Sequence, residues 1–597
     1  MTKNDKQFVK FIKLNKSNNE EIKNSIEHFF GMNNFQTYFP AMSYWINFEN
    51  NNFSRQLFSL DSKYQLVSLE RKSDKTDSDT LYLGYLKKRG INNTINKKIK
   101  HEIHFKINPI LEPLNTIMNK YQLESPGLLP CVFDYITNKK INSPHNFSYV
   151  ETMFAYLGNK LVEKGKCPSF PYFYGSYIGI MKNYKHNISD DYHTIKKCSW
   201  FNKNKDKLFE LEQISIESEL FKDISNLPEI NNDEQEKKDN QLNVEELDFE
   251  SINLTKNPKR KRCLSGEGCF SKHSDNNNQE DEEDKDDEED KDDEDKDKED
   301  EEDEEDKEDK EDKESEWETE SESDLDSELN LDDCIDRIGS DNDSDNDSNN
   351  NSDNEENIFD EDMDDFNYYI KMNNFPVQLI AMESLKETLD DLLNNKNKHS
   401  DQEWIAILFQ IIFGLSVAQK HFKFTHNDLH SSNIMFKPTK TPYLYFSVKG
   451  KYYKVPTFGK ITKIIDFARA IYTVEDKHFF SDVFKKDGDA EGQYTYPYKS
   501  NTKIKHPPNF SFDLCYLAIT IIDKFDNNSP IHALLEKWVT DKYGNNLSNH
   551  ELNFDLYIKI AHNICNAIPK NQFSHHLFNT FRINRDKIPQ GQYIYYL

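Results

Sequence analysis

Two short stretches decide how this chain folds and acts: THNDLHSSNIMF at residues 425–436 and KIIDFARAI at residues 463–471. The first carries an acid, Asp428, and an amide, Asn433, five residues apart, and the second carries Asp466 at the end of a predicted strand. Phosphoryl transfer needs such a set, because one carboxylate orients the acceptor hydroxyl while an amide oxygen and a second carboxylate hold Mg²⁺ on the phosphates. The alternative is a polar turn and an ordinary strand end.

The sequence leading to this site predicts alternating strands and helices. Residues 401–424, DQEWIAILFQIIFGLSVAQKHFKF, space apolar side chains such as Trp404 and Leu408 at helical intervals, which predicts a helix buried on a broad face. FPVQLIAMESL at residues 375–385 predicts a buried strand, and ETLDDLLNN at residues 387–395 predicts a short helix. The two acids and the amide are therefore expected on a scaffold of mixed structure.

Two upstream segments supply a candidate cation and its partner. EIHFKI at residues 102–107 alternates like a strand and carries Lys106, while residues 146–165, NFSYVETMFAYLGNKLVEKG, have helical spacing and carry Glu151 early in the helix. A phosphotransferase of this kind needs a lysine on the phosphates and a glutamate that holds the lysine. The alternative is that both are exposed surface charges in a lysine-rich chain.

These residues resemble the protein-kinase superfamily. HNDLHSSN at residues 426–433 is similar to the H-R-D-L-x-x-x-N catalytic loop, and IIDFA at residues 464–468 is similar to D-F-G. The resemblance implies an α+β, bilobal protein-kinase-like fold that binds ATP and Mg²⁺. It implies that Asp428 and His430 are catalytic and that Asn433 and Asp466 are metal ligands. Lys106 and Glu151 would bind ATP, and the hinge around adenine would be formed by Met382, Glu383 and Leu385. His426 and Asp513 would be structural.

For Asp513 the helix-capping role of an N-terminal aspartate remains an open alternative. The chain also departs from the family pattern. Before Lys106 no G-x-G-x-x-G occurs, and Gly84 and Gly90 are the only nearby glycines, so the loop that covers the phosphates is divergent or absent. The arginine of H-R-D is Asn427, which argues against activation through a phosphorylated loop, and the D-F-G glycine is Ala468.

Charge divides the chain into a folded part and an acidic part. The net charge is -31, but residues 275–365 alone carry 51 acidic against 8 basic residues, which leaves the remainder mildly basic. Like charges repel and little apolar surface offsets the entropy of ordering the backbone, so a disordered insertion is expected. We expect an N-terminal region of unknown role at residues 1–80 and a small lobe at residues 81–185. The acidic insertion would follow at residues 186–368, and a hinge with a helical large lobe at residues 369–597.

The expected reaction is transfer of the ATP γ-phosphoryl group to a serine or threonine hydroxyl of a protein. Two rivals remain open: a small-molecule kinase of the aminoglycoside or choline type, which shares the pattern around His430, and a weakly catalytic pseudokinase scaffold. Residues 426–436 followed by 454–472 also resemble kinase-like proteins of giant nucleocytoplasmic DNA viruses (mimivirus-like). A viral source would place the protein in host cytoplasm or virion.

The partners and compartment follow from composition. The acidic block suits a basic partner and repels nucleic acid, although a simple solvated linker is the alternative. Eight scattered cysteines form no C-x-x-C pair, and no signal peptide or run of eighteen apolar residues is found, so a soluble intracellular protein without membrane contact is expected. PKRKR at residues 258–262 is a weak nuclear-import candidate.

Overall fold

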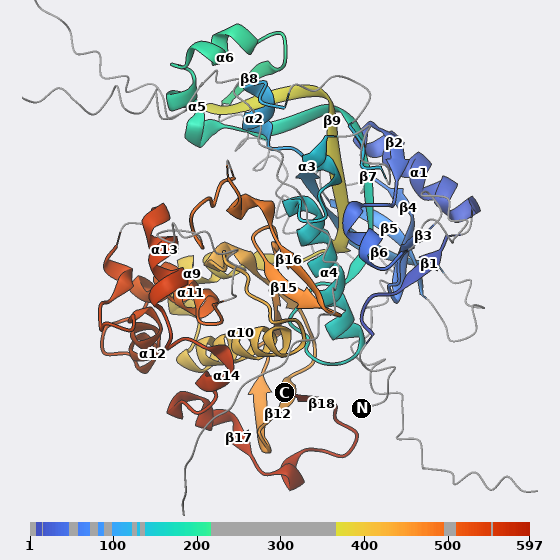
Figure 1. Ribbon diagram of the computed structural model, residues 1–597. Coiled ribbons are helices and arrows are strands. Elements are labelled where there is room, and N and C mark those ends of the chain that lie inside the picture. The colour runs from blue at the N-terminus through green and yellow to red at the C-terminus, as the bar shows by residue number, and fades with distance from the viewer. Residues whose placement is uncertain are drawn as a thin grey trace, which may run out of the picture. The chain divides into compact units, whose positions relative to one another are not determined.

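The computed structural model combines helices and antiparallel sheets, in agreement with the α+β class (Figure 1). The structure describes residues 7–14, 16–46, 58–71, 81–88, 98–121, 128–131, 138–215, 366–486, 488–494, 509–550 and 553–597. The predictions about the acidic block, PKRKR and Gly90 concern residues outside these ranges.

An antiparallel sheet organises the first half of the molecule. Its strands are β2 (Met32–Gln36), β7 (Phe173–Asn187), β9 (Phe366–Glu383), β6 (Lys98–Pro109), β5 (Leu81–Lys88) and β4 (Tyr64–Glu70), in that order, with β8 (Glu210–Ser215) paired to β9. The central strand β9 pairs with both β6 and β7, so both of its edges are hydrogen bonded, and its apolar run is buried. The register places Lys106 opposite Ile380.

Described parts of residues 1–80 belong to this folded unit. Helix α1 (Lys16–Phe30) contacts β4, β2 lies beside β7, and β1 (Phe11–Lys13) pairs with β3 (Phe58–Leu60). Phe30 packs on Phe105 of β6 with ring centroids 4.9 Å apart. The region that had no sequence-based role thus covers the sheet that carries Lys106.

Residues 186–215 differ from the expected organisation, which assigned them to the insertion. They complete β7 and form α5 (Ser189–Ile195), α6 (Ser199–Asn204) and β8. Polar composition misled the prediction, because β8 gains its backbone hydrogen bonds from β9 and a few aromatic residues suffice for a small core. Tyr192 stacks on Tyr368 with centroids 3.7 Å apart, and Phe201 packs on Phe209.

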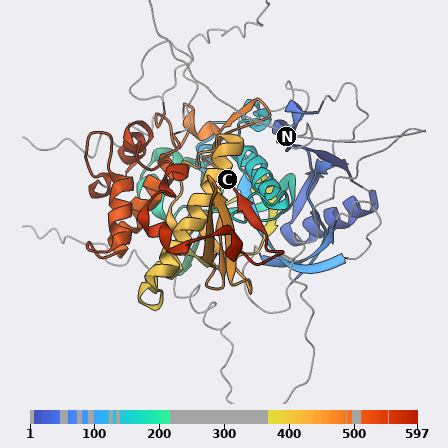
Figure 2. The same cartoon turned by 90° about the horizontal axis from the view of Figure 1, so that it is seen from below.

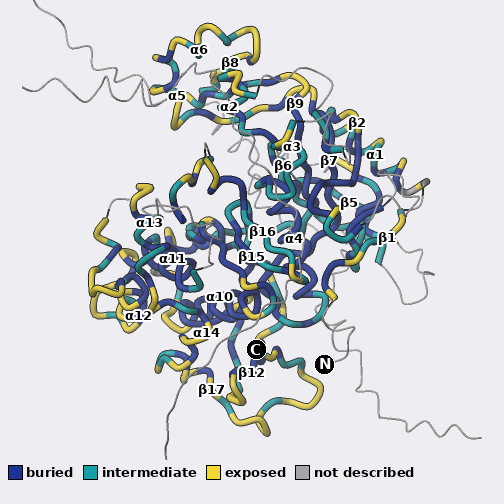
Figure 3. The backbone as a smooth tube through the Cα atoms, viewed as in Figure 1, coloured by how far each residue is buried: buried dark blue, intermediate teal, exposed yellow. Residues whose placement is uncertain are grey.

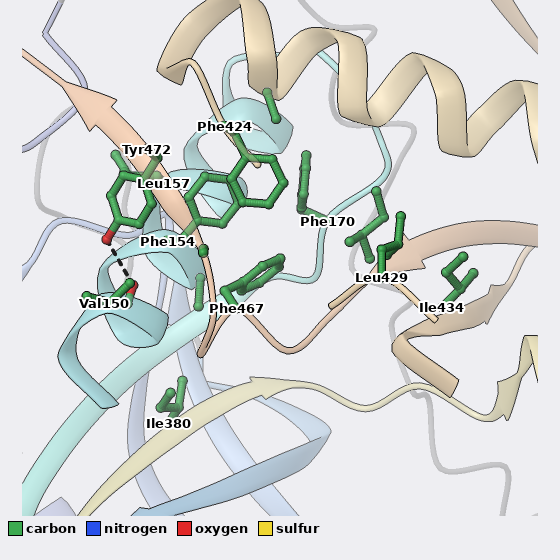
Figure 4. Packing of buried hydrophobic residues seen from close by; sticks show 14 of the residues in the cluster. Val150, Phe154, Leu157, Phe170, Ile380, Phe424, Leu429, Ile434, Phe467 and Tyr472 are labelled. Carbon is green, nitrogen blue, oxygen red and sulfur yellow. Dashed lines mark hydrogen bonds between the residues drawn. The ribbon is translucent and has the colours of Figure 1, made fainter. Parts of the chain in front are cut away.

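Helix α4 (Phe147–Glu163) crosses between the sheet and the remaining elements. Asn146 caps it by accepting a hydrogen bond from the Ser148 backbone N–H. Phe154 stacks on Phe424 at 4.0 Å between centroids and contacts Phe467, so the helix is packed against the segments that carry Asp428 and Asp466 (Figure 4). Short helices α2 (Pro113–Ile117) and α3 (Lys139–Asn142) precede it.

Helix α10 (Asp401–Phe422) is the core of the second half. It is long and apolar enough to cross a membrane by length and composition, but 83% of its apolar window is buried inside the protein, as expected for a core helix. Buried residues, dark blue in Figure 3, line α10, α4 and the middle of β9. Around it are α9 (Leu389–Asn394), α11 (Phe512–Ile521), α12 (Pro530–Val539), α13 (Phe554–Asn563) and α14 (Pro569–Gln572). Figures 1 and 2 show α1 and the α11–α13 group on opposite sides of α10.

Short sheets connect these helices to the site. One contains β10 (Glu387–Thr388), β11 (Ile434–Pro438) and β14 (Lys460–Ile464), and a hairpin consists of β15 (Ile471–Val474) and β16 (Lys477–Phe480). The long gap between Asn433 and Asp466 contains the hairpin β12 (Tyr443–Val448) and β13 (Lys451–Pro456). Strands β17 (Arg582–Ile583) and β18 (Ile594–Tyr596) extend that hairpin into a four-stranded sheet.

Candidate active site

Lys106, Glu151 and Asp466 come together from three separate elements. The Lys106 Nζ lies 2.7 Å from Glu151 Oε1 on α4 and 2.8 Å from Asp466 Oδ1 beyond β14. Alternation along β6 puts Asn108 on the same face as Lys106, where its Nδ2 donates to Glu151 Oε2 at 2.7 Å. Both glutamate oxygens are therefore engaged, which fixes the lysine at one place beside Asp466.

The exposure of this group differs from residue to residue. The Glu151 side chain is 3% exposed, whereas Lys106 and Asp466 are 28% and 38% exposed. Burial alone would lower the pKa of Lys106, but the charges of Asp466 and Glu151 outweigh it and raise the pKa. Burial would likewise raise the pKa of Asp466, yet Lys106 holds it below its ordinary value. A cation and a carboxylate thus stay ionised and accessible.

The backbone at the site adopts a conformation that non-glycine residues rarely take. Asp466 has φ 64° and Asn427 has φ 65°, both in the left-handed region. Such conformations persist where surrounding contacts enforce them, and they concentrate at functional sites. The Ile465 N–H donates to the Asn433 carbonyl at 3.1 Å and so ties the two stretches together. Ala468, at the position of the family glycine, has no positive φ, so alanine fits without strain.

The loop that carries Asp428 is held by a buried carboxylate. Asp513 on α11 accepts hydrogen bonds from the backbone N–H groups of His426 and Asn427, each at 3.0 Å. Ser511 occupies the N-cap position of α11, so the carboxylate of Asp513 supports the loop rather than capping its helix. Burial raises the pKa of Asp513 to about 7, although these hydrogen bonds oppose the shift. His426 completes the brace through its Nε2, which lies 2.8 Å from the Ile465 carbonyl oxygen.

Within the loop, the side chains face one another. The Asn433 Nδ2 donates to the Asp428 carbonyl at 2.8 Å and lies 3.0 Å from His430 Nε2. Because its Nδ2 is engaged within the loop, Asn433 offers its side-chain amide oxygen, and a hard cation prefers oxygen ligands. Among the described contacts, His430 thus reaches Asn433, a candidate metal ligand, and not the carboxylate of Asp428.

Asn427 shows how the loop manages without the family arginine. Its Nδ2 donates to the Arg469 carbonyl at 2.9 Å, and its Oδ1 accepts a hydrogen bond from the Tyr494 hydroxyl. A neutral amide therefore joins the loop to the segment after Asp466. A charged arginine at position 427 would need an anion as its partner.

The hinge candidates lie at the end of β9. Met382 pairs with His104 of β6 and Phe173 of β7. The Glu383 backbone N–H already donates to the Tyr172 carbonyl at 2.9 Å, so that group is not available to adenine. Its side chain is sealed in a separate cluster, in which Lys437 and Lys463 both contact the carboxylate. Leu385 is partly buried beyond the strand end.

The segment expected to cover the phosphates lies largely outside the described residues, so its divergence or absence stays a prediction. Strands β4 and β5 are joined by residues 71–80, RKSDKTDSDT, which contain no glycine, and residues 72–80 lie outside the described part. Gly84 lies inside β5, where an added Cβ would come within 2.4 Å of Ile103 Cγ1. This glycine therefore permits close strand packing.

Sequence reasoning missed three contributors to the site. Asn108 could have been found, because it lies two residues after Lys106 on the same strand face. Tyr557 of α13 donates to Asp428 Oδ1 at 3.0 Å, and Tyr516 of α11 contacts the Tyr557 hydroxyl. No local pattern announces these two tyrosines, because helix packing alone brings them to the loop.

The residues present fit a magnesium-bound nucleotide by donor type. Asn433 and Asp466 offer oxygen atoms from two strand ends that pair in β11 and β14, and Lys106 stands beside Asp466. Within the described ranges no cluster of three or more His, Cys, Asp and Glu residues could hold a metal by itself. A cation held by two protein ligands needs further oxygens, and nucleotide phosphates supply them in sites of this type.

Comparison with known proteins supports a protein-kinase-like family. The chain is similar to the serine/threonine-protein kinase haspin homolog of Drosophila melanogaster, with 28% identity over 170 residues, 26% of this chain and 30% of that protein. It is also similar to the serine/threonine-protein kinase haspin of Bos taurus, with 25% identity over 28% of this chain and 22% of that protein. The serine/threonine-protein kinase haspin of Mus musculus is 32% identical over 20% of this chain and 17% of that protein.

No family model matches the chain. The chain spans less than a third of the length of these curated relatives. The three relatives come from an insect and two mammals, and they give no support to the giant-virus resemblance. The names of these relatives describe serine/threonine-protein kinases.

Proposed function

We propose that this chain is a bilobal protein kinase that transfers the γ-phosphoryl group of ATP to a serine or threonine hydroxyl of a protein. One observation carries the proposal: Lys106, held by Glu151, lies 2.8 Å from Asp466, which in turn is tied through Ile465 to the loop of Asp428 and Asn433. In this hypothesis the sheet of Lys106 and helix α4 form the small lobe. The elements from α9 onward form the large lobe.

Each residue then has a part in positioning. Lys106 places its charge on the nucleotide phosphates, with Glu151 and Asn108 fixing its side chain. Asn433 and Asp466 hold Mg²⁺, which when bound neutralises charge on the phosphate oxygens. Asp428 orients the acceptor hydroxyl and receives its proton as the bond from acceptor oxygen to phosphorus forms and the bond to ADP breaks. Met382, Leu385 and the Glu383 carbonyl group face the adenine.

The protein acceptor rests on the relatives, whose names describe serine/threonine-protein kinases. His430 stands where protein kinases of the serine/threonine group carry a lysine, and it is the feature that the small-molecule kinases share. The substrate that becomes labelled therefore distinguishes the two acceptor classes.

The decisive experiment compares wild type with Asp428→Asn in transfer from radiolabelled ATP. Removing a general base costs about 10² to 10⁴ in rate, so the variant should be nearly silent while its unfolding midpoint stays close to that of wild type. Tyr543→Phe, at a site 71% exposed, is the matched control and should label substrate normally. Equal labelling by wild type and Asp428→Asn would show that Asp428 is not the base.

A binding measurement separates an enzyme from a scaffold. Mg-ATP that binds only the native state must raise the melting temperature, and Lys106→Met should weaken that shift. A protein that shows no stabilisation at millimolar Mg-ATP, and no transfer, would be a pseudokinase scaffold and would contradict the proposed function.

A further inference from the structure

A tyrosine from a distant helix contacts the candidate base. The Tyr557 hydroxyl of α13 donates to Asp428 Oδ1 at 3.0 Å, although 129 residues separate the two in sequence. The hydroxyl of Tyr516, on α11, is hydrogen bonded to the Tyr557 hydroxyl, and the two rings lie 4.8 Å apart between centroids. The carboxylate of Asp428 is therefore the end of a chain of two hydroxyl groups.

The direction of the hydrogen bond follows from the chemistry of the groups. Burial, and after it the negative charge of Asp428, raises the pKa of Tyr557 above its ordinary value. Tyr557 therefore keeps its proton and acts as donor, and the carboxylate acts as acceptor. A carboxylate held at Oδ1 still presents Oδ2 to an incoming hydroxyl. The contact thus leaves an oxygen atom for the acceptor's proton.

Helix α13, which carries Tyr557, is held by hydrogen bonds at both of its ends. Asn553 caps α13 by accepting from the Leu556 backbone N–H, and the Asn509 Nδ2 donates to the carbonyls of Ile560 and Ala561. These contacts fix the helix. The Tyr557 ring itself lies against Phe512 and Phe554, with ring centroids 6.2 Å and 6.4 Å away.

A cation stabilises the ring as well. The Arg469 guanidinium lies 5.4 Å from the centroid of the Tyr557 ring, within the range of a cation–π contact. Arg469 follows Asp466 by three residues, and its carbonyl accepts from Asn427. The tyrosine is therefore joined to both stretches that carry the site, which is more than packing of α13 would require.

We propose that Tyr557 is a positioning residue for phosphoryl transfer: its hydroxyl holds the Asp428 carboxylate in the orientation that receives the acceptor proton, and Tyr516 supports it. This inference rests on the proposed function and deepens it. It assigns to α13 a role in catalysis that acts through Asp428 rather than on the nucleotide.

The first test measures steady-state kinetics of Tyr557→Phe. Removing a hydrogen bond to a charged group should lower kcat about tenfold, while KM for the acceptor changes by less than about twofold. The melting temperature should stay close to that of wild type, so that the loss of kcat does not come from a smaller folded fraction. Tyr516→Phe should change the same quantities in the same direction but less, and Tyr543→Phe should change none.

These readouts separate positioning from two other roles. A variant whose KM for the acceptor falls while kcat stays or rises would show that Tyr557 occupies the acceptor's place and competes with it, which overturns the proposal. A variant with unchanged kinetics would overturn it too. A merely structural role would lower the melting temperature and the active fraction, while kcat per folded molecule would stay at the wild-type value.

The second test does not depend on activity. Fluorotyrosine placed at residue 557 of the full chain reports its surroundings through the ¹⁹F chemical shift, which should move in Asp428→Asn because the neighbouring negative charge is gone. An unchanged chemical shift would show that the contact does not exist in solution. Wild type that transfers no phosphate, with the change in chemical shift present, would refute the proposed function and with it the catalytic role, while the contact itself would stand.

Discussion

Two clusters of lysine and carboxylate, built from the same residue types, have opposite designs. In the first, Lys106 contacts two carboxylates, Glu151 and Asp466, and the lysine is 28% exposed. In the second, Glu383 contacts two lysines, and the side chains of Glu383 and Lys463 are each only 1% exposed. One cluster has an excess of negative charge near solvent, and the other has an excess of positive charge around a buried carboxylate, with only Lys437 reaching solvent at 21% exposure.

The difference shows what makes an ion cluster a site. A partly exposed group with spare negative charge can accept Mg²⁺ and a nucleotide, because water and ligand reach it. The sealed group can do neither, and its energy depends on keeping every charge paired. Its Lys463 Nζ also donates to the Phe170 carbonyl at 2.7 Å, which satisfies the second lysine. The sealed cluster therefore supports the junction of β9 with β11 and β14.

The largest expected effect comes from breaking the sealed cluster. Glu383→Gln leaves buried lysine charge without its partner and should lower the free energy of unfolding by about 3 to 5 kcal/mol. Burial already lowers the pKa of Lys463 although Glu383 opposes it. Chemical denaturation measures the loss, and ATP turnover per folded molecule should remain close to wild type. A loss below about 1 kcal/mol would contradict the assigned structural role.

Breaking the cluster of Lys106 should lower phosphoryl transfer far more than breaking the cluster of Glu383 does. Lys106→Met removes a fixed charge from the phosphates and should lower kcat about 10² to 10³-fold, as for other preorganised electrostatic groups. Its unfolding midpoint should also fall, because Glu151 is 3% exposed and keeps only its hydrogen bond from Asn108, so transfer is measured per folded molecule. Radiolabel transfer together with thermal melting checks both halves of the prediction. Normal transfer by this variant would remove Lys106 from the site.

A pH titration sharpens the comparison without a mutation. Burial would raise the pKa of Glu383, but Lys437 and Lys463 lower it from 4.5 to about 2. A carboxylate with a depressed pKa contributes stability that is full above pH 4.5 and is lost as pH falls toward 2, here about 3 kcal/mol. Unfolding measured across that window should show this slope in wild type and a reduced slope in Glu383→Gln. Identical slopes would contradict the assignment.

The smallest effect is expected at an exposed pair. Lys386 contacts Glu102 at 2.7 Å, the same distance as Lys106 to Glu151, but the lysine is 54% exposed. Lys386→Ala should change the free energy of unfolding by only about 0.5 kcal/mol, because water and salt screen the pair. The denaturation assay used for Glu383→Gln measures it. A cost of several kcal/mol would show that distance rather than burial sets the energy of these pairs.

Parts of the site followed from local sequence, because their members are neighbours along the chain. Asp428 and Asn433 lie in one loop, and the placement of Lys106 on a strand and Glu151 on a helix followed from periodicity, as β6 and α4 show. Tyr557 could not be found this way. Its helix reaches Asp428 only through the packing of α13 on α11, which no nearby residue encodes.

The sequence by itself determined the order of elements, the helical and strand periods, and the spacing of the acid and the amide, since each depends on residues within a few positions of one another. Only the tertiary structure decided which lysine meets which carboxylate, which pair is sealed, and that residues 186–215 extend the sheet. These outcomes depend on strand register and helix packing between segments hundreds of residues apart, where side chains of the same type compete for the same partners.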